Sequence, residues 1–160
     1  MEYEDLKVID EKAAALGALA DGVWEHPETA FTEVVSAGLL ADFLEQEGFA
    51  VTRGVADIPT AFSARYGSGK PVIGLLGEFD ALSGLSQKAG VPQPCPLTAG
   101  GNGHGCGHTL LGVGSLAAAL AVKQYLQRTG APGTVVYYGC PGEEGGSGKA
   151  FMARSGVFGE

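Results

Sequence analysis

The chain has 160 residues, a formal net charge of −8, and ten lysines and arginines that form no basic run. This distribution argues against a nucleic-acid or anionic-membrane partner, because both need a concentrated positive surface. The acidic N-terminus is not a targeting signal, the longest apolar stretch, Leu110–Val122, is too short to span a bilayer, and the three cysteines form no disulfide pattern. We therefore expect one cytoplasmic domain.

Two helices and three strands are predicted for the first half of the chain. Apolar residues at helical spacing indicate helices over residues 4–22 and Thr32–Glu47, with Thr32 as a candidate N-cap and Gly48 as the C-terminal glycine. Strand candidates follow at Phe49–Arg53, Ala61–Tyr66 and Pro71–Gly77. The third is continuously apolar, which is typical of a strand that is buried on both faces.

The second half is expected to begin with a long irregular segment. Residues 80–105 show no periodicity, and a segment of that length within a domain usually serves a function or is disordered. A helix over Thr109–Arg128, a buried strand over Gly133–Cys140 and a further helix over Gly145–Ser155 follow. This order predicts an α/β fold with helices on both faces of a mixed sheet.

Cys106-Gly107-His108 is the first candidate for chemistry, in a segment rich in glycine. In an extended or looped backbone residues i and i+2 point the same way, so the thiol and the imidazole aim at one point. Both groups bind zinc, and the N-terminus of the following helix favours the thiolate. A buried cysteine beside a loop histidine is the non-functional interpretation of the same residues.

Carboxylates follow two apolar strands. Glu143 and Glu144 come soon after the strand that ends at Cys140, and Glu78 and Asp80 share a face at the end of an earlier strand. Ligands of open α/β sheets bind at the C-terminal ends of strands, and a cation relieves the repulsion between neighbouring carboxylates. Each motif alone is compatible with a solvated acidic turn, but together they supply a thiolate, imidazoles and carboxylates.

Four segments together resemble the M20 metallopeptidase family, namely WEHPETAFTE, GEFDAL, GHGCGHTLLGVGSLAAA and GCPGEEGGSGKA. The similarity is greatest to its amidohydrolase branch, of the aminobenzoyl-glutamate hydrolase B-subunit and N-acyl amino acid hydrolase type. It implies a three-layer α/β/α zinc-exopeptidase-like catalytic domain, of which residues 1–160 form the N-terminal portion. The family's lid and dimerisation domain and its downstream metal-binding histidines are absent, so the chain looks truncated.

The resemblance also implies roles for individual residues. Cys106 and His108 match metal ligands of the family, and Glu144 matches a further metal ligand. Glu143 matches the general acid/base. The ligand set implies one or two divalent ions, with zinc or manganese expected.

Three other residues match the family outside this ligand set. Asp80 falls where the family has a carboxylate near the metal, and His104 matches a histidine beside the ligands. His26 looks like a structural feature of the N-terminal helical pair. The resemblance further implies a homodimer for the full-length form.

The sequence therefore predicts a metal-dependent hydrolase that cleaves the amide bond of an N-acyl amino acid, a dipeptide or aminobenzoyl-glutamate, with Glu143 moving the proton. A non-catalytic, incomplete metal-binding fragment is one alternative. Another is a hydrolase with Cys106 as nucleophile and His108 or His104 as its base. Nucleotide binding is disfavoured, because Glu143 stands where a phosphate loop needs its first glycine.

Overall fold

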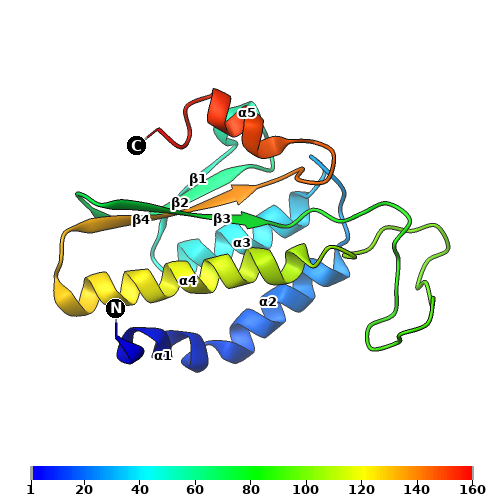
Figure 1. Cartoon of the computed structure of the whole chain (residues 1–160), viewed down its shortest axis with the longest axis horizontal. Helices are drawn as coiled ribbons and strands as arrows, with labels where there is room; N and C mark the ends of the chain where they lie inside the picture. Colours follow the sequence, from blue (N-terminus) through cyan, green and yellow to red (C-terminus); the bar gives the residue numbers. More distant parts are fainter. Residues whose placement is uncertain (1, 160) are drawn as a thin grey trace.

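The computed structural model describes residues 2–159 as a sheet with helices on either side (Figure 1). The predicted helices and strands recur close to their expected places. In chain order the elements are α1 (Tyr3–Glu11), α2 (Ala13–Glu25), α3 (Val34–Gln46), β1 (Ala50–Arg53), the short 3₁₀ helix η1 (Val55–Asp57), β2 (Phe62–Ser68), β3 (Val72–Glu78), α4 (His108–Thr129), β4 (Gly133–Cys140) and α5 (Gly148–Arg154).

The strands form a mixed sheet in the order β1-β2-β4-β3. β2 pairs antiparallel with β1 and with β4, whereas β3 pairs parallel with β4 from Val72↔Thr134 to Glu78↔Cys140. The crossover between the two parallel strands contains α4. Because β3 and β4 run in the same direction, their C-terminal ends lie at the same edge of the sheet, where open α/β sheets bind ligands.

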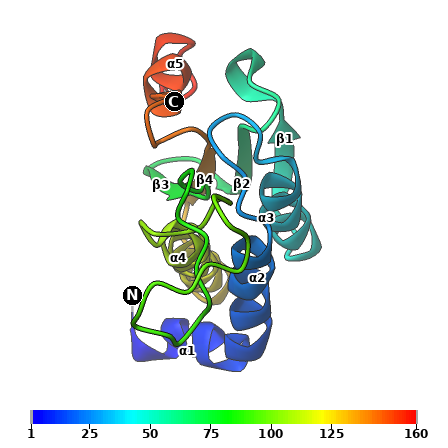
Figure 2. The same ribbon diagram turned by 90° about the vertical axis from the view of Figure 1, so that its right-hand side faces the viewer.

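Helices cover both faces of the sheet, which confirms the predicted α/β fold. In Figure 2, α1 to α4 lie below the sheet and α5 lies above it. The larger core packs α2, α3 and α4 against the sheet, and the smaller one lies on the face that carries α5 and includes Val136, Tyr138 and Met152. Every residue of β4 is buried, as the sequence predicts.

The prediction for Pro71–Gly77 is wrong in one respect. β3 pairs only with β4 among residues 2–159, so it forms an edge of the sheet rather than a strand that is buried on both faces. Ile73 and Leu76 are 44% and 41% exposed. A continuous apolar run indicates that a strand can be buried, but strand pairing over long distances in sequence determines whether neighbours cover it.

The helix expected over residues 4–22 is divided at Lys12, which has φ −101° and ψ 8° and separates α1 from α2. α1 packs along α4, whereas α2 packs against α3 and α4. The Lys12 ammonium binds the Glu47 carboxylate at 2.6 Å and ties the break to the end of α3. Apolar spacing continues through the break, so the sequence pattern does not reveal it.

α3 begins at Val34, two residues later than predicted, and Thr32 does not cap it. The Thr32 hydroxyl donates to the carbonyl oxygen of Thr29 at 2.7 Å. The Glu28 carboxylate instead accepts hydrogen bonds from the amides of Val35 and Ser36, both at 2.9 Å. These amides belong to the first turn, whose N–H groups have no partner within the helix. At the other end, Gly48 has φ +82°, as expected of a C-terminal glycine.

α4 is the long helix of the core and extends over His108–Thr129. By length and composition alone, this helix could cross a membrane. These two properties are weak evidence for a membrane span, because the core helices of other proteins share them. Here it packs against β3, β4, α1 and α2. At Gly112 it approaches β3 so closely that a Cβ atom would lie 2.6 Å from the carbonyl oxygen of Glu78. The glycine therefore allows the start of α4 to reach the end of β3.

Candidate metal centre

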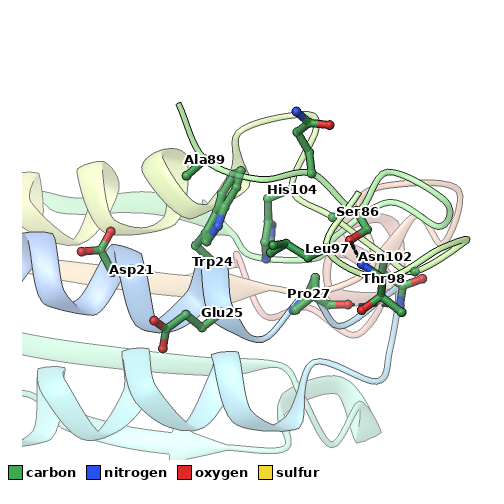
Figure 3. Close-up of a pocket in the computed structure, with 13 residues that line it drawn as sticks. Asp21, Trp24, Glu25, Pro27, Ser86, Ala89, Leu97, Thr98, Asn102 and His104 are labelled. Atoms are coloured by element: carbon green, nitrogen blue, oxygen red, sulfur yellow. Dashed lines mark hydrogen bonds between the residues drawn. The ribbon is translucent and has the colours of Figure 1, made fainter. Parts of the chain in front are cut away.

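A cavity of about 700 Å³ lies between α2 and the irregular segment 86–104 (Figure 3). On its wall, the rings of Trp24 and His104 have centroids 6.2 Å apart. The buried His104 donates from Nε2 to the carbonyl oxygen of Val23 at 3.0 Å, and burial lowers the pKa of its imidazole. His104 thus fixes the irregular segment to α2, and Cys106, His108 and Glu144 do not line this cavity.

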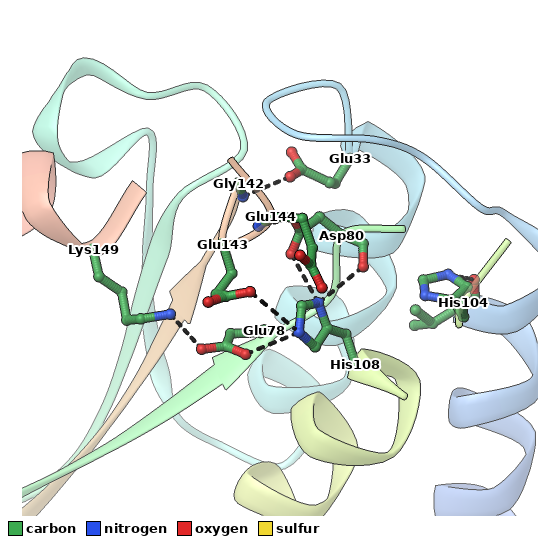
Figure 4. Close-up of polar contacts among 10 residues, drawn as sticks. Glu33, Glu78, Asp80, His104, His108, Gly142, Glu143, Glu144 and Lys149 are labelled. Carbon is green, nitrogen blue, oxygen red and sulfur yellow. Dashed lines mark hydrogen bonds and ion pairs between the residues drawn. The ribbon is translucent and has the colours of Figure 1, made fainter. Parts of the chain in front are cut away.

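Four of the residues predicted to carry chemistry, Asp80, His108, Glu143 and Glu144, gather instead at the ends of β3 and β4 (Figure 4). β3 ends at Glu78, with Asp80 two residues beyond it. Glu143 and Glu144 follow β4, and α4 begins at His108. The parallel pairing of the strands and the close approach of α4 therefore bring three distant segments to one place.

Asp80 holds two of these segments at once. Nδ1 of His108 lies 3.0 Å from the carbonyl oxygen of Asp80 and 3.0 Å from its Oδ1. The backbone amide of Glu144 donates to Oδ2 of Asp80 at 2.8 Å. If Nδ1–H of His108 donates to Asp80, the lone pair is on Nε2, which is the arrangement found in metal-binding histidines.

Cys106, His108 and Glu144 each offer a donor atom within 4.8 Å of the other two. The histidine is buried, the glutamate half-buried and the cysteine exposed. Thiolate, imidazole and carboxylate are all zinc ligands, and three protein ligands with an open position are typical of catalytic sites. The predicted ligands are thus brought together, and their donor atoms fit a divalent cation.

A second set of donor atoms shares the same histidine. Glu78, His108 and Glu143 also lie within 4.8 Å of one another. Nε2 of His108 is 3.1 Å from Oε2 of Glu78 and 3.7 Å from Oε2 of Glu143. The ammonium of Lys149 pairs with the other oxygen of Glu78. Because Nδ1 of His108 contacts Asp80, both sets depend on the single nitrogen Nε2.

The charges in this cluster act on one another. Hydrogen bonding to Asp80 raises the pKa of His108 above that of an ordinary imidazole. Burial acts to raise the pKa of Asp80, but hydrogen bonds from His108 and the Glu144 amide outweigh it and lower that pKa. A hydrogen bond to Glu144, burial and the nearby carboxylates raise the pKa of the Cys106 thiol.

The N-terminus of α4, which is expected to favour a Cys106 thiolate, is not the only charge near that sulfur. The carboxylates of Glu144, Glu143 and Glu78 all act in the opposite direction. A bound cation would reverse their effect, because coordination deprotonates a thiol. The same observation disfavours Cys106 as the nucleophile of a thiol hydrolase, since the thiolate is the reactive form.

Three residues that contribute to this region have no role assigned from the sequence. Lys149 belongs to none of the predicted sites and Glu78 is predicted only as a strand-end carboxylate, yet the two form an ion pair beside His108. Glu33 is fully buried and accepts a hydrogen bond from the Gly142 amide at 2.8 Å. A glutamate at the start of an amphipathic helix gives no sequence signal for such a distant contact.

Comparison with known proteins identifies the family. Residues 74–160 match the profile of Peptidase family M20/M25/M40. The chain belongs to this family. The M20 chain is 63% identical over 140 residues to the B subunit of p-aminobenzoyl-glutamate hydrolase from Escherichia coli (strain K12), and 33% identical over 174 residues to the human Xaa-Arg dipeptidase. These alignments cover 88% and 99% of the M20 chain.

A solved structure supports both the family and the fold. The M20 chain is similar to a Bacillus subtilis protein described as a dinuclear metal-binding peptidase of the M20 family, with 25% sequence identity and a TM-score of 0.74. The match covers 91% of the M20 chain and 39% of the solved one. The M20 chain spans only 29% of the Escherichia coli relative and 36% of the human one. It therefore corresponds to about a third of the length of these proteins.

Proposed function

We propose that this chain is the part of an M20 hydrolase that holds a catalytic metal and the general base, and that the enzyme cleaves the amide bond of an N-acyl amino acid, a dipeptide or aminobenzoyl-glutamate. The convergence of donor atoms from Cys106, His108 and Glu144 within 4.8 Å carries the proposal. The relatives named as a p-aminobenzoyl-glutamate hydrolase and an Xaa-Arg dipeptidase support the substrate class.

Cys106, His108 and Glu144 would hold a divalent ion, with zinc or manganese the expected metal. When bound, such an ion polarises a carbonyl oxygen and makes water more acidic. Asp80 orients the ligand His108 by accepting from Nδ1, and it anchors Glu144 through the backbone amide. These contacts fix two of the three ligands before any metal arrives, which lowers the cost of ordering them on binding.

Glu143 is proposed to act as general acid/base. Its side chain is 39% exposed, so it can reach both water and a substrate. A carboxylate that lies near a cation without binding it can take a proton from water and deliver it to the leaving amine. Glu143 follows directly after the anchored Gly142, and this position beside Glu144 places its carboxylate 3.7 Å from Nε2 of His108.

Glu78 and Glu143 form the other possible cation position, again with His108. Both positions require Nε2 of His108, and Lys149 neutralises part of the charge on Glu78. We therefore propose one ion bound through these residues. A second ion would need ligands beyond those that converge here.

Metal content of the purified chain tests this function. After dialysis against Zn²⁺ and removal of free metal, we expect about one equivalent of zinc by mass spectrometry. Cys106→Ala should retain less zinc, whereas Cys95→Ala removes a half-buried cysteine outside both donor sets and should retain as much as the wild type. Full metal content in Cys106→Ala would remove that residue from the ligand set.

Assays with aminobenzoyl-glutamate, N-benzoylglycine and dipeptides then separate the remaining alternatives. A metal-dependent hydrolase loses activity with a chelator, and a hydrolase with a cysteine nucleophile does not. A chain that binds zinc and cleaves none of these substrates would be the incomplete metal-binding module.

A further inference from the structure

Glu33 makes a contact that spans almost the whole chain. Its Oε1 accepts a hydrogen bond from the amide of Gly142 at 2.8 Å, although the two residues are 109 positions apart. Glu33 is fully buried at the start of α3, and its other oxygen, Oε2, has no hydrogen-bond partner in the part of the chain that the structure describes. Burying a carboxyl group with an unsatisfied oxygen costs free energy on folding. A glutamate at this buried position therefore needs a structural explanation.

Gly142 is the residue directly before Glu143 and Glu144. Its backbone has φ +62°, and its carbonyl oxygen accepts from the amide of Gly148 at 3.2 Å. The amide of Glu144 is held by Asp80. The two proposed functional glutamates therefore lie in a short loop whose backbone is fixed by Glu33 before Glu143 and by Asp80 after it (Figure 4).

The segment that carries Glu33 is itself fixed. The ring of Phe31 lies against the same loop, because a Cβ atom at Gly142 would be 2.9 Å from that ring and one at Gly146 would be 2.8 Å from it. Phe31 has φ +63°, a conformation that non-glycine residues rarely adopt. The amide of Ala81, next to Asp80, donates to the carbonyl oxygen of Glu28. The segment 28–33 thus contacts two of the three chain segments at the candidate metal centre, the one that follows β3 and the one that follows β4.

We propose that Glu33 is a positioning residue that directs the Glu143 and Glu144 side chains toward His108 through the amide of Gly142. This inference rests on the proposed metal site. Glu33 does not contact the cation position itself. Its effect passes through the backbone, because the φ and ψ angles at Gly142 decide where the next two side chains point.

Cobalt(II) titration of the purified chain tests this proposal without any assay of activity, because the visible spectrum of Co²⁺ reports its ligand geometry. In Glu33→Ala the Gly142 amide loses its acceptor, and in Glu33→Asp the acceptor is withdrawn by one methylene. Both variants should bind Co²⁺ about 10- to 100-fold more weakly and with altered d–d bands. The thiolate-to-cobalt band should persist, since Cys106 lies on another segment.

Glu33→Gln keeps an oxygen at the Oε1 position and should restore the wild-type spectrum and an affinity within about threefold of the wild type. Thr134→Val is the matched control, because it removes another buried side-chain hydrogen bond, from the Thr134 hydroxyl to the carbonyl oxygen of Gly69 at 2.9 Å, at the end of β4 opposite the candidate metal centre. It should leave Co²⁺ binding unchanged. Thermal unfolding of each variant identifies any that do not fold, and Glu33→Asp provides the test if Glu33→Ala is one of them.

The outcomes distinguish the two proposals. A wild-type chain without a thiolate-to-cobalt band would refute the metal site. A wild-type chain that binds Co²⁺, together with a folded Glu33→Asp variant of the same affinity and spectrum, would refute only the role of Glu33. Loss of affinity in Glu33→Gln equal to that in Glu33→Ala would also overturn it, because the hydrogen-bond acceptor is retained.

Discussion

Asp80 connects the segments that carry two of the proposed ligands. It accepts from Nδ1 of His108 and from the amide of Glu144, and it is only 1% exposed. Asp80→Asn replaces one carboxylate oxygen with an NH₂ group, so the side chain can accept only one of these two bonds, and the substitution removes the charge. We expect zinc to bind about 10- to 100-fold more weakly, as measured by competition with a chromophoric chelator.

The exposed Asp57 provides a control for the loss of one negative charge, and Asp57→Asn should bind zinc like the wild type. If Asp80→Asn also keeps wild-type affinity, the bonds to His108 and Glu144 do not organise the ligands.

Glu143 and Glu144 are adjacent in sequence but are expected to differ in role. Only Glu144 belongs to the donor set with Cys106. In Glu143→Gln we expect unchanged zinc content and a rate of amide hydrolysis about 10²- to 10⁴-fold lower, because the amide cannot take a proton from water. Zinc content is measured by mass spectrometry and the rate by release of the amine product. A Glu143→Gln variant without zinc would mean that the two glutamates exchange roles.

For single residues, the sequence predicts metal-binding groups that are close together in the chain. It does not predict contacts between residues that are far apart in the chain. Cys106 and His108 can be paired from their spacing, because residues i and i+2 in a looped backbone point the same way. The bond from Gly142 to Glu33 depends on how α3 lies against the loop after β4. No periodicity or motif in either segment reports that geometry.

The contact between α4 and β3 determines how the start of α4 reaches the candidate metal centre. In Gly112→Ala the new Cβ would lie 2.6 Å from the backbone oxygen of Glu78, so helix and strand must separate. We expect the free energy of unfolding in urea to fall by about 1–3 kcal/mol. Gly114→Ala is the matched control on the same helix, because no atom lies within 4 Å of its Cβ position.

Gly114→Ala should raise stability by about 0.5–1 kcal/mol, since alanine favours a helix over glycine. Equal effects of the two substitutions would show that helix propensity, and not the approach to β3, governs Gly112.

Among the helices and strands, the sequence predicts best those whose apolar residues follow a clear pattern over neighbouring positions. β4 is largely apolar and fully buried, and α4 is within one residue of its predicted bounds at either end. β3 has an equally apolar sequence but lies at the sheet edge, because its pairing depends on chain segments far away. The sequence pattern does not separate α1 from α2 for a similar reason, since only α2 also packs against α3, and both α3 and α4 are distant in sequence.

Contacts between distant parts of the chain also hold the whole molecule together. α1 packs along α4, and the guanidinium of Arg128 in its last turn donates to both oxygens of Asp5, at 2.7 and 3.0 Å. These residues are 123 positions apart, and the Asp5 side chain is fully buried. The pair joins the N-terminal helix to the end of α4 that points away from the candidate metal centre.

This ion pair predicts how the stability of the chain depends on pH. Hydrogen bonding from Arg128 is the main cause that lowers the pKa of Asp5 to about 2. A carboxyl group whose pKa is lower in the folded than in the unfolded chain stabilises the fold fully above its ordinary pKa of about 3.9, and this contribution is lost as the pH falls toward the folded value. The free energy of unfolding in urea should therefore decrease between about pH 5 and about pH 2.

In Asp5→Asn that part of the decrease should disappear, and the variant should be less stable than the wild type at pH 7. Asp10→Asn is the control, because Asp10 is exposed on the same helix, and this variant should follow the wild type. The same pH dependence in Asp5→Asn and the wild type would show that the contact between α1 and α4 does not depend on this charge.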